Sequence, residues 1–117
     1  MNKRQIGGIK EQLAAKYLQD KGLYILETNY RNRFGEIDII AKDNDTIVFI
    51  EVKYRKTAST GHPEEAVNYK KIKTICKVSD YYRITKKLSI NTPIRYDVIA
   101  IEGAKLRWHI NAFSYTI

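Results

Sequence analysis

The stretch Gly35-Glu36-Ile37-Asp38-Ile39-Ile40-Ala41, with the stretch Ile47-Val48-Phe49-Ile50-Glu51-Val52-Lys53 that follows it, decides how this chain folds. Each stretch is apolar enough for a buried β-strand. The residues between them are typical of a turn, because Asn and Asp adopt left-handed backbone conformations easily. The two stretches therefore predict a β-hairpin. Each strand also carries charged residues where a buried strand should have none, and burying them unpaired would be costly.

The length of the turn decides which side chains share a face of the hairpin. A two-residue loop (Asn44 and Asp45) and a four-residue loop (42–45) both place even positions of the first strand beside odd positions of the second. A three-residue loop or a bulge would break this register. The charged face is then predicted to contain Glu36, Asp38, Ile40, Ile47, Phe49, Glu51 and Lys53. The other face is predicted to be wholly apolar and to contain Ile37, Ile39, Ala41, Val48, Ile50 and Val52.

The charged face has an excess of negative charge, since three carboxylates accompany one lysine. A buried salt-bridge cluster, with Lys53 paired to Glu51, is one interpretation. A hard divalent cation is the other, because Mg²⁺ prefers a few carboxylate oxygens and completes its octahedron with water and substrate phosphate. Such a site activates a bound water and neutralises charge during phosphodiester hydrolysis. This interpretation predicts Mg²⁺, with Mn²⁺ as a substitute, bound by Asp38 and Glu51, and Lys53 orienting the water or stabilising the developing charge.

The rest of the chain predicts an α/β domain that covers residues 1–117, a typical length for one domain. The expected order is helix, three strands, helix, two strands, which gives a mixed sheet of about five strands flanked by helices. These elements follow from apolar periodicity and from turn residues. We expect helices over 5–21 and 62–82, strands over 23–30, 94–101 and 106–110 besides the hairpin, and an edge strand or coil over 111–117.

Two charged residues have unusual positions on the expected helices. Glu11 has no cation at ion-pair spacing on its own helix and shares a side with small and apolar residues. It is therefore either a boundary carboxylate with its head in water or an acid that points toward the body of the protein. Lys71 lies on an inward stripe with Val67, Ile75 and Val78. Cys76, the only cysteine, excludes an internal disulfide and is most simply a small core residue.

The net charge of +8 and the pI near 9.6 favour a polyanionic partner, above all nucleic acid. Basic residues concentrate between positions 53 and 87, where tyrosines are interleaved with them, as phosphate contact and base stacking require. A solvated lysine-rich helix face is the simpler alternative. No apolar run could span a membrane and no signal peptide is recognisable, so we expect a cytoplasmic protein. The predicted nucleic-acid contacts are Arg55, Lys56, Lys70, Lys71, Lys73 and Lys77.

The spacing of Asp38, twelve further residues and then Glu51-Val52-Lys53 resembles the signature of the PD-(D/E)XK nuclease superfamily. Over nearly the whole chain, the sequence is similar to the YraN-like family of small bacterial proteins. The segments that carry this resemblance, besides the two strands, are 61–67 and 95–98, with Ala14, Tyr17-Leu18 and Gly22 in the first helix. Two positions depart from the patterns: Ile37 precedes Asp38 where the superfamily has proline, and Lys10 stands where the family usually has glycine.

The resemblance implies a restriction endonuclease-like fold related to that of Holliday-junction resolvases. It implies metal ligands at Asp38 and Glu51, a catalytic lysine at Lys53 and an auxiliary acid at Glu11. The implied activity is a Mg²⁺-dependent DNA endonuclease acting on branched or recombination and repair DNA, with a homodimer as the analogous assembly. A nucleic-acid-binding module that keeps the fold without catalysis is the alternative, because a fold does not fix a function.

Overall fold

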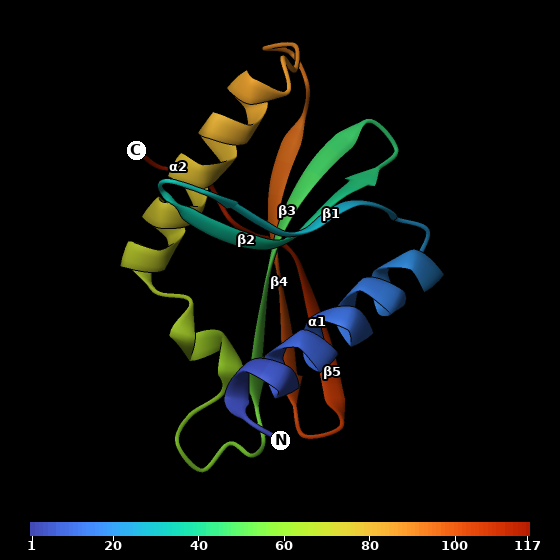
Figure 1. Ribbon diagram of the computed structural model, residues 1–117, viewed down its shortest axis with the longest axis vertical. Helices are drawn as coiled ribbons and strands as arrows, with labels where there is room; N and C mark the ends of the chain where they lie inside the picture. Colours follow the sequence, from blue (N-terminus) through green and yellow to red (C-terminus); the bar gives the residue numbers. More distant parts are fainter.

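The computed structural model describes residues 1–117 as two α-helices, one short 3₁₀ helix and a five-stranded sheet. The predicted order of helix, three strands, helix and two strands is confirmed (Figure 1). The elements are α1 (Lys3–Asp20), β1 (Tyr24–Asn32), β2 (Gly35–Asp43), β3 (Thr46–Arg55), η1 (Pro63–Ala66), α2 (Tyr69–Thr85), β4 (Ile94–Glu102) and β5 (Lys105–Phe113).

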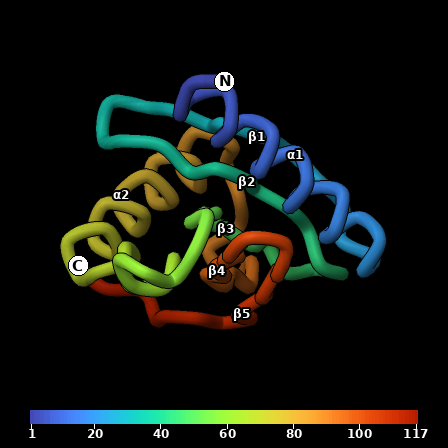
Figure 2. The backbone as a smooth tube through the Cα atoms, turned by 90° about the horizontal axis from the view of Figure 1, so that it is seen from below, coloured from blue at the N-terminus to red at the C-terminus, as the bar shows by residue number.

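The sheet is mixed, and its strands lie side by side in the order of the sequence. Strands β3 and β4 are parallel, with α2 as the crossover between them, and the other neighbours are antiparallel. The two helices cover opposite faces, as the view along the sheet shows (Figure 2). On one face Ala14 and Leu18 of α1 pack on a cluster that includes Ile39 and Ile50. On the other face α2 packs on a cluster centred on Phe49 and Tyr96, which includes the buried Cys76.

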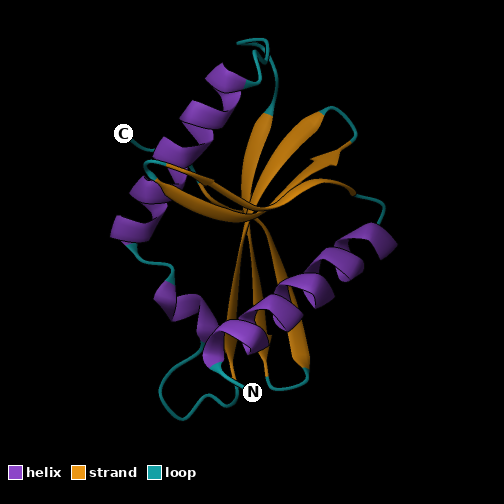
Figure 3. Cartoon of the chain, viewed as in Figure 1, coloured by secondary structure: helices purple, strands orange, loops and turns teal.

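The hairpin of β2 and β3 has the predicted register, because Asp43 pairs with Thr46 across a two-residue turn. Its pairing continues only as far as Ile39 and Ile50. Beyond that point the start of β2 turns toward α2, whereas β3 continues beside β4 and β5 (Figure 3). This divergence corrects one expectation: Ile37 was placed on the face of Ile39, but it packs in the cluster below α2.

The second expected helix, 62–82, is two helices in the structure. Pro63 opens only the short η1, and the backbone leaves helical geometry at Val67. Asn68 then caps a new helix, since its side chain accepts a hydrogen bond from the Lys71 N–H at 3.0 Å. The expectation of one helix was therefore wrong, because an asparagine inside an apolar pattern has a stronger preference for the cap than for the helix interior.

Smaller differences lie at the ends of the other elements. Helix α1 begins at Lys3 because Asn2 and Gln5 form a reciprocal capping box, and Gly22, with a φ of +96°, follows its end as predicted. Strand β5 extends to Phe113, beyond the predicted end at residue 110. The tail therefore provides the end of β5 and then coil, and no separate edge strand forms.

Gly35, the first residue of β2, is expected to be sensitive to substitution. Its φ is +147°, and a Cβ atom built there would lie 2.9 Å from Cγ2 of Thr74 on α2. Gly35→Ala should therefore lower the free energy of unfolding by about 1–3 kcal/mol, measured by urea denaturation. Gly8→Ala is the matched control, because a Cβ there meets nothing within 4 Å and alanine favours a helix interior. Equal stability of the two variants would contradict this role of Gly35.

Candidate functional site

Asp38 and Glu51 lie together where strands β2 and β3 separate. Both are almost fully buried, with 9% and 3% of their surfaces exposed. Strand pairing has ended at this point, so the backbone N–H of Val52 has no partner on β2 and donates instead to Oδ2 of Asp38 at 2.8 Å. The divergence of the strands thus holds one carboxylate beside the other.

Burial is the largest cause that raises the pKa of Asp38, and its hydrogen bond to Glu51 and the charge of Glu51 add to it. The resulting pKa is about 9, although the Val52 N–H favours the ionised form. At neutral pH Asp38 is therefore protonated and shares that proton with Glu51. Two buried carboxylates that need a proton between them form a place where a cation would be strongly favoured.

Two lysines approach the same oxygen of Glu51 from different elements. Lys53 Nζ, from β3, is 3.6 Å from Oε2 of Glu51, and Lys71 Nζ, from α2, is 3.1 Å from it. Neither contact is a well-directed hydrogen bond, so this buried oxygen has no hydrogen-bond partner. Burial acts to lower the pKa of Lys71, but the negative charge of Glu51, with those of Asp38 and Glu36, outweighs burial, and the pKa of Lys71 lies above its ordinary value.

Glu11, the expected auxiliary acid, is half-buried on the side of α1 that faces the sheet. Burial raises its pKa, and the charges of Glu36 and Glu51 raise it further, so Glu11 lies within the electrostatic field of the site. When the Asn29 amide is oriented with its nitrogen toward the carboxylate, Asn29 donates to Oε1 of Glu11 at 2.5 Å. The charge of Glu11 in turn contributes to the raised pKa of Asp38.

Glu36 lies at the outer edge of this cluster. Its carboxylate accepts a hydrogen bond from Arg31 Nη2 at 3.0 Å, and 40% of its side chain is exposed. It therefore has a cation of its own on the neighbouring strand, and its charge helps to raise the pKa of Glu11 and of Lys71.

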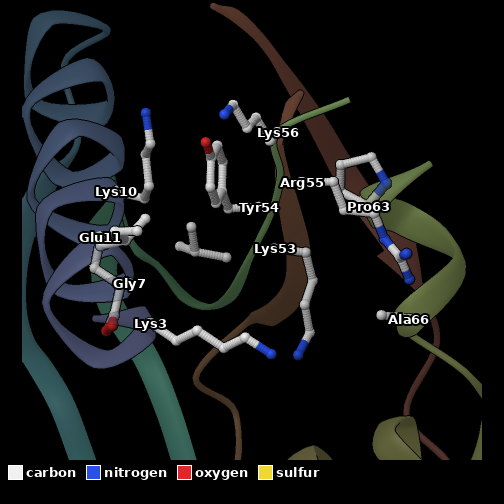
Figure 4. Close-up of a pocket in the computed structure, with 12 residues that line it drawn as sticks. Lys3, Gly7, Lys10, Glu11, Lys53, Tyr54, Arg55, Lys56, Pro63 and Ala66 are labelled. Atoms are coloured by element: carbon white, nitrogen blue, oxygen red, sulfur yellow. The ribbon is translucent and has the colours of Figure 1, made fainter. Parts of the chain in front are cut away.

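A pocket of about 550 Å³ opens between the first turns of α1, the end of β3 and η1, and neither Asp38 nor Glu51 lines it. Glu11 and Lys53 form part of its lining, so it is continuous with the site (Figure 4). Tyr54 stands in it between Lys10 and Lys56, and Lys10 Nζ lies 4.6 Å from the centre of the tyrosine ring.

The predicted nucleic-acid contacts fall in two places. Arg55 and Lys56 lie at the end of β3 in the pocket, where Arg55 Nη1 donates to the Thr60 side chain at 2.8 Å. The other four lie on α2, and of these Lys71 turns inward to Glu51, as its stripe predicted. Lys70 and Lys77 are exposed, and Lys73 lies over the ring of Tyr69.

Several other charged side chains bind one another and link the strands and η1. Asp97, fully buried, accepts hydrogen bonds from Arg95, from the indole of Trp108 and from the backbone N–H of Asn111. Both histidines contact carboxylates: His62 contacts Glu102 at 2.6 Å and His109 contacts Glu64 at 2.8 Å. Arg107 binds both of these glutamates and so joins η1 to the hairpin of β4 and β5.

Three contributors to the site were missed from the sequence. Nothing in the sequence identifies Asn29 as a contributor. In the structure its backbone is left-handed, with a φ of +53°. Lys3 and Lys10 lie at a spacing of seven on α1, next to Glu11, which places them on one face of the helix. That spacing could have identified them once the inward direction of Glu11 was settled.

No three His, Cys, Asp or Glu side chains form a ready-made group able to hold a metal ion. The buried carboxylate pair is therefore the candidate site by itself. The structure also has no helix with the length and apolar character needed to cross a membrane.

The order of the elements and the mixed five-stranded sheet match the fold expected for the PD-(D/E)XK, restriction endonuclease-like, class. More particularly, the chain belongs to the Uncharacterised protein family UPF0102, whose profile matches residues 10–101, and this confirms the resemblance to YraN-like proteins. It is 51% identical over 112 residues to a UPF0102 protein of Alkaliphilus oremlandii, covering 95% of each chain. It is 44% identical over 113 residues to one of Lachnoclostridium phytofermentans, covering 97% of this chain and 96% of that one. A UPF0102 protein of Vibrio parahaemolyticus is 43% identical over 116 residues, covering 97% and 95%.

Proposed function

We propose that this protein is a Mg²⁺-dependent endonuclease that hydrolyses phosphodiester bonds in DNA. The observation that carries the proposal is the buried pair of Asp38 and Glu51, which needs a shared proton, beside Lys53, which lines a basic pocket. A purely structural cluster has little reason to keep two carboxylates in contact, because an apolar pair would be cheaper to bury.

The donor set suits Mg²⁺. The pair offers carboxylate oxygens, and a divalent cation would replace the proton that the two acids share. Oε2 of Glu51 lacks a hydrogen-bond partner and so has a lone pair to offer. Mg²⁺ commonly uses one or two carboxylates and keeps several waters, so a third protein ligand is not needed. The ion would supply an activated water and neutralise charge on the phosphate under attack.

The residues around the pair have separate tasks in this proposal. The Val52 N–H orients the Asp38 carboxylate, and Lys71 holds Glu51 from the α2 side. Lys53, whose side chain is 30% exposed, faces the pocket through which a substrate would enter, and it can stabilise charge on the phosphate. Glu11, whose pKa is raised by burial and by the nearby charges of Glu36 and Glu51, is the candidate group to accept or return a proton.

DNA as the substrate is supported by charge. The chain carries a net charge of +8, and the residues of the pocket include five cations and one carboxylate, Glu11. Such a surface attracts a polyanion and releases its counterions on binding.

The proposal is tested by incubating the protein with Mg²⁺ or Mn²⁺ and linear, nicked, flap and four-way-junction DNA. We expect metal-dependent cleavage, most efficient on branched substrates, that is lost in EDTA. Glu51→Gln serves as the matched inactive variant, since it keeps the shape of the side chain. If no substrate is cut beyond the level of Glu51→Gln, the protein is not a nuclease on these DNAs.

A second candidate, a nucleic-acid-binding module without catalysis, is favoured by one observation. Both lysines sit on the same oxygen of Glu51 and partly neutralise the acid that would hold the metal. This candidate predicts DNA binding with a steep salt dependence and no heat on titration with Mg²⁺ in calorimetry. Measurable metal heat that disappears in Glu51→Gln would exclude it.

A further inference from the structure

The pocket lined by Glu11 and Lys53 contains several lysines that no carboxylate neutralises. Lys3, Lys10 and Lys56 line it, and none of them forms a salt bridge with a carboxylate. Like charges that gather without counter-charges disfavour the free protein and favour a bound anion. In Figure 4 the side chains of Lys3 and Lys53 extend from opposite walls toward the same end of the pocket. That end has the character of a phosphate site.

The aromatic ring in the pocket adds a second element. Tyr54 is half-buried, its inner part packs against the core on the α1 side, and Lys10 lies over its ring. A lysine over a tyrosine is a weak, exchangeable contact at a partly exposed site, and a nucleobase stacks on the same kind of surface. Phosphate-binding lysines next to a stacking ring are the pattern of sites for single-stranded nucleic acid.

The size and the walls of the pocket limit what can enter. About 550 Å³ lies within the range of sites for small ligands, which suits one nucleotide. Helix α1 stands on one side and η1 on the other, and η1 is tied to β5 through the Glu64–Arg107 ion pair, with a shortest distance of 2.6 Å. A base pair would need these walls to separate, whereas a single unpaired nucleotide would not.

We propose that this pocket binds one unpaired nucleotide of the strand that is cut, with its phosphate between Lys3 and Lys53 and its base against Tyr54. This inference rests on the proposed function and deepens it: the substrate class is DNA with a single-stranded segment next to the cleavage point. Continuous duplex is then a poor substrate because it presents no free nucleotide to the pocket.

The test measures binding without metal, so that it does not depend on catalysis. Fluorescence anisotropy in EDTA would compare a labelled oligothymidylate of about 12 nucleotides with a blunt duplex of equal length. We expect the single strand to bind at least about tenfold more tightly than the duplex. Lys3→Ala and Lys10→Ala should each weaken single-strand binding about three- to tenfold and lower the salt slope by about 0.7 per cation. Tyr54→Leu should weaken it similarly, and Tyr54→Phe should restore it.

Lys42→Ala is the matched control, because Lys42 is exposed and lies next to Ile47, at the far end of β3 from Lys53. It removes the same charge and should leave the single-strand preference unchanged. Thermal melts of each variant would confirm that it folds. A duplex bound as tightly as the single strand, or Lys3 and Lys10 variants that behave like Lys42→Ala, would overturn the proposal.

Three further measurements test what the pocket binds and whether it acts with the nuclease. Competition with thymidine monophosphate and with inorganic phosphate identifies what the pocket recognises: we expect thymidine monophosphate to displace the oligonucleotide at lower concentration than inorganic phosphate, and equal displacement by the two would overturn the proposal. The predicted binding pattern with no cleavage of any DNA would support nucleotide binding in the pocket and exclude the proposed nuclease activity. The opposite result is cleavage of blunt duplex at a rate that Lys3→Ala and Lys10→Ala leave unchanged. It would support the proposed nuclease activity and exclude the proposed nucleotide site in the pocket.

Discussion

Asp38→Asn is expected to abolish metal-dependent cleavage, by at least about 10³-fold, and at the same time to make the protein more stable. Asn keeps the shape of the side chain and can still accept the Val52 N–H, but it cannot provide an anionic ligand. It also removes the need for the proton that Asp38 shares with Glu51. At pH 7 we expect a gain of about 2–4 kcal/mol in the free energy of unfolding, or roughly 10 °C in Tm.

The sign of this effect follows from the pKa. A carboxyl with a pKa of about 9 in the folded protein and an ordinary value of 3.8 holds a proton in the folded state that the unfolded chain releases. Stability of the parent protein therefore falls as pH rises between about 4 and 9, and this loss is absent in Asp38→Asn. Mg²⁺ should stabilise the parent, more strongly at higher pH, and leave Asp38→Asn unchanged.

Thermal melts between pH 5 and 9, with and without Mg²⁺, would measure both effects. Asp45→Asn is the control, since this exposed turn residue makes the same chemical change far from the pair. A loss of stability in Asp38→Asn at neutral pH, or an equal response of both variants to Mg²⁺, would contradict a protonated, metal-binding Asp38.

Lys53→Met and Lys71→Met are expected to have different effects, because the two lysines that approach Glu51 have different roles: Lys53 in turnover and Lys71 in stability. Lys53 lines the pocket, so its loss should lower turnover about 10²- to 10³-fold with little change in stability. Lys71 approaches from α2, outside the pocket lining, and at 3.1 Å it is the nearer cation to a buried carboxylate. Its loss should lower the free energy of unfolding by roughly 1–2 kcal/mol, less than for a fully buried pair because Lys71 is 30% exposed. Its effect on turnover should be about tenfold.

The measurement combines single-turnover cleavage with urea denaturation of both variants. Lys77→Met, on the exposed side of α2, makes the same change at a site without a carboxylate partner. The assignment fails if Lys71→Met reduces turnover as much as Lys53→Met while keeping the parental stability.

The sequence was sufficient for the order of elements and for the register of the central hairpin, because both depend on local rules. Asn44 and Asp45 favour a two-residue turn, and strand periodicity then places Asp38 and Glu51 together. The prediction that Lys71 faces inward rested on helical periodicity in the same way, and its contact with Glu51 agrees with it.

What the sequence could not supply comes from the shape of the sheet. The separation of β2 from β3 depends on how the strands bend toward α2, which moves Ile37 to the other face from Ile39. The same separation frees the Val52 N–H for Asp38. The inward direction of Glu11 and the pocket beside it depend on how α1 packs over the sheet, and periodicity within the helix left both options open for Glu11.

A crystal grown with Mn²⁺ would show directly whether Asp38 and Glu51 bind a metal ion. Data collected at the manganese absorption edge should give one anomalous peak between the carboxylates of Asp38 and Glu51, and no peak in crystals of Asp38→Asn grown in the same way. Anomalous density only elsewhere on the protein, or none at millimolar Mn²⁺, would contradict a metal-dependent site at this pair.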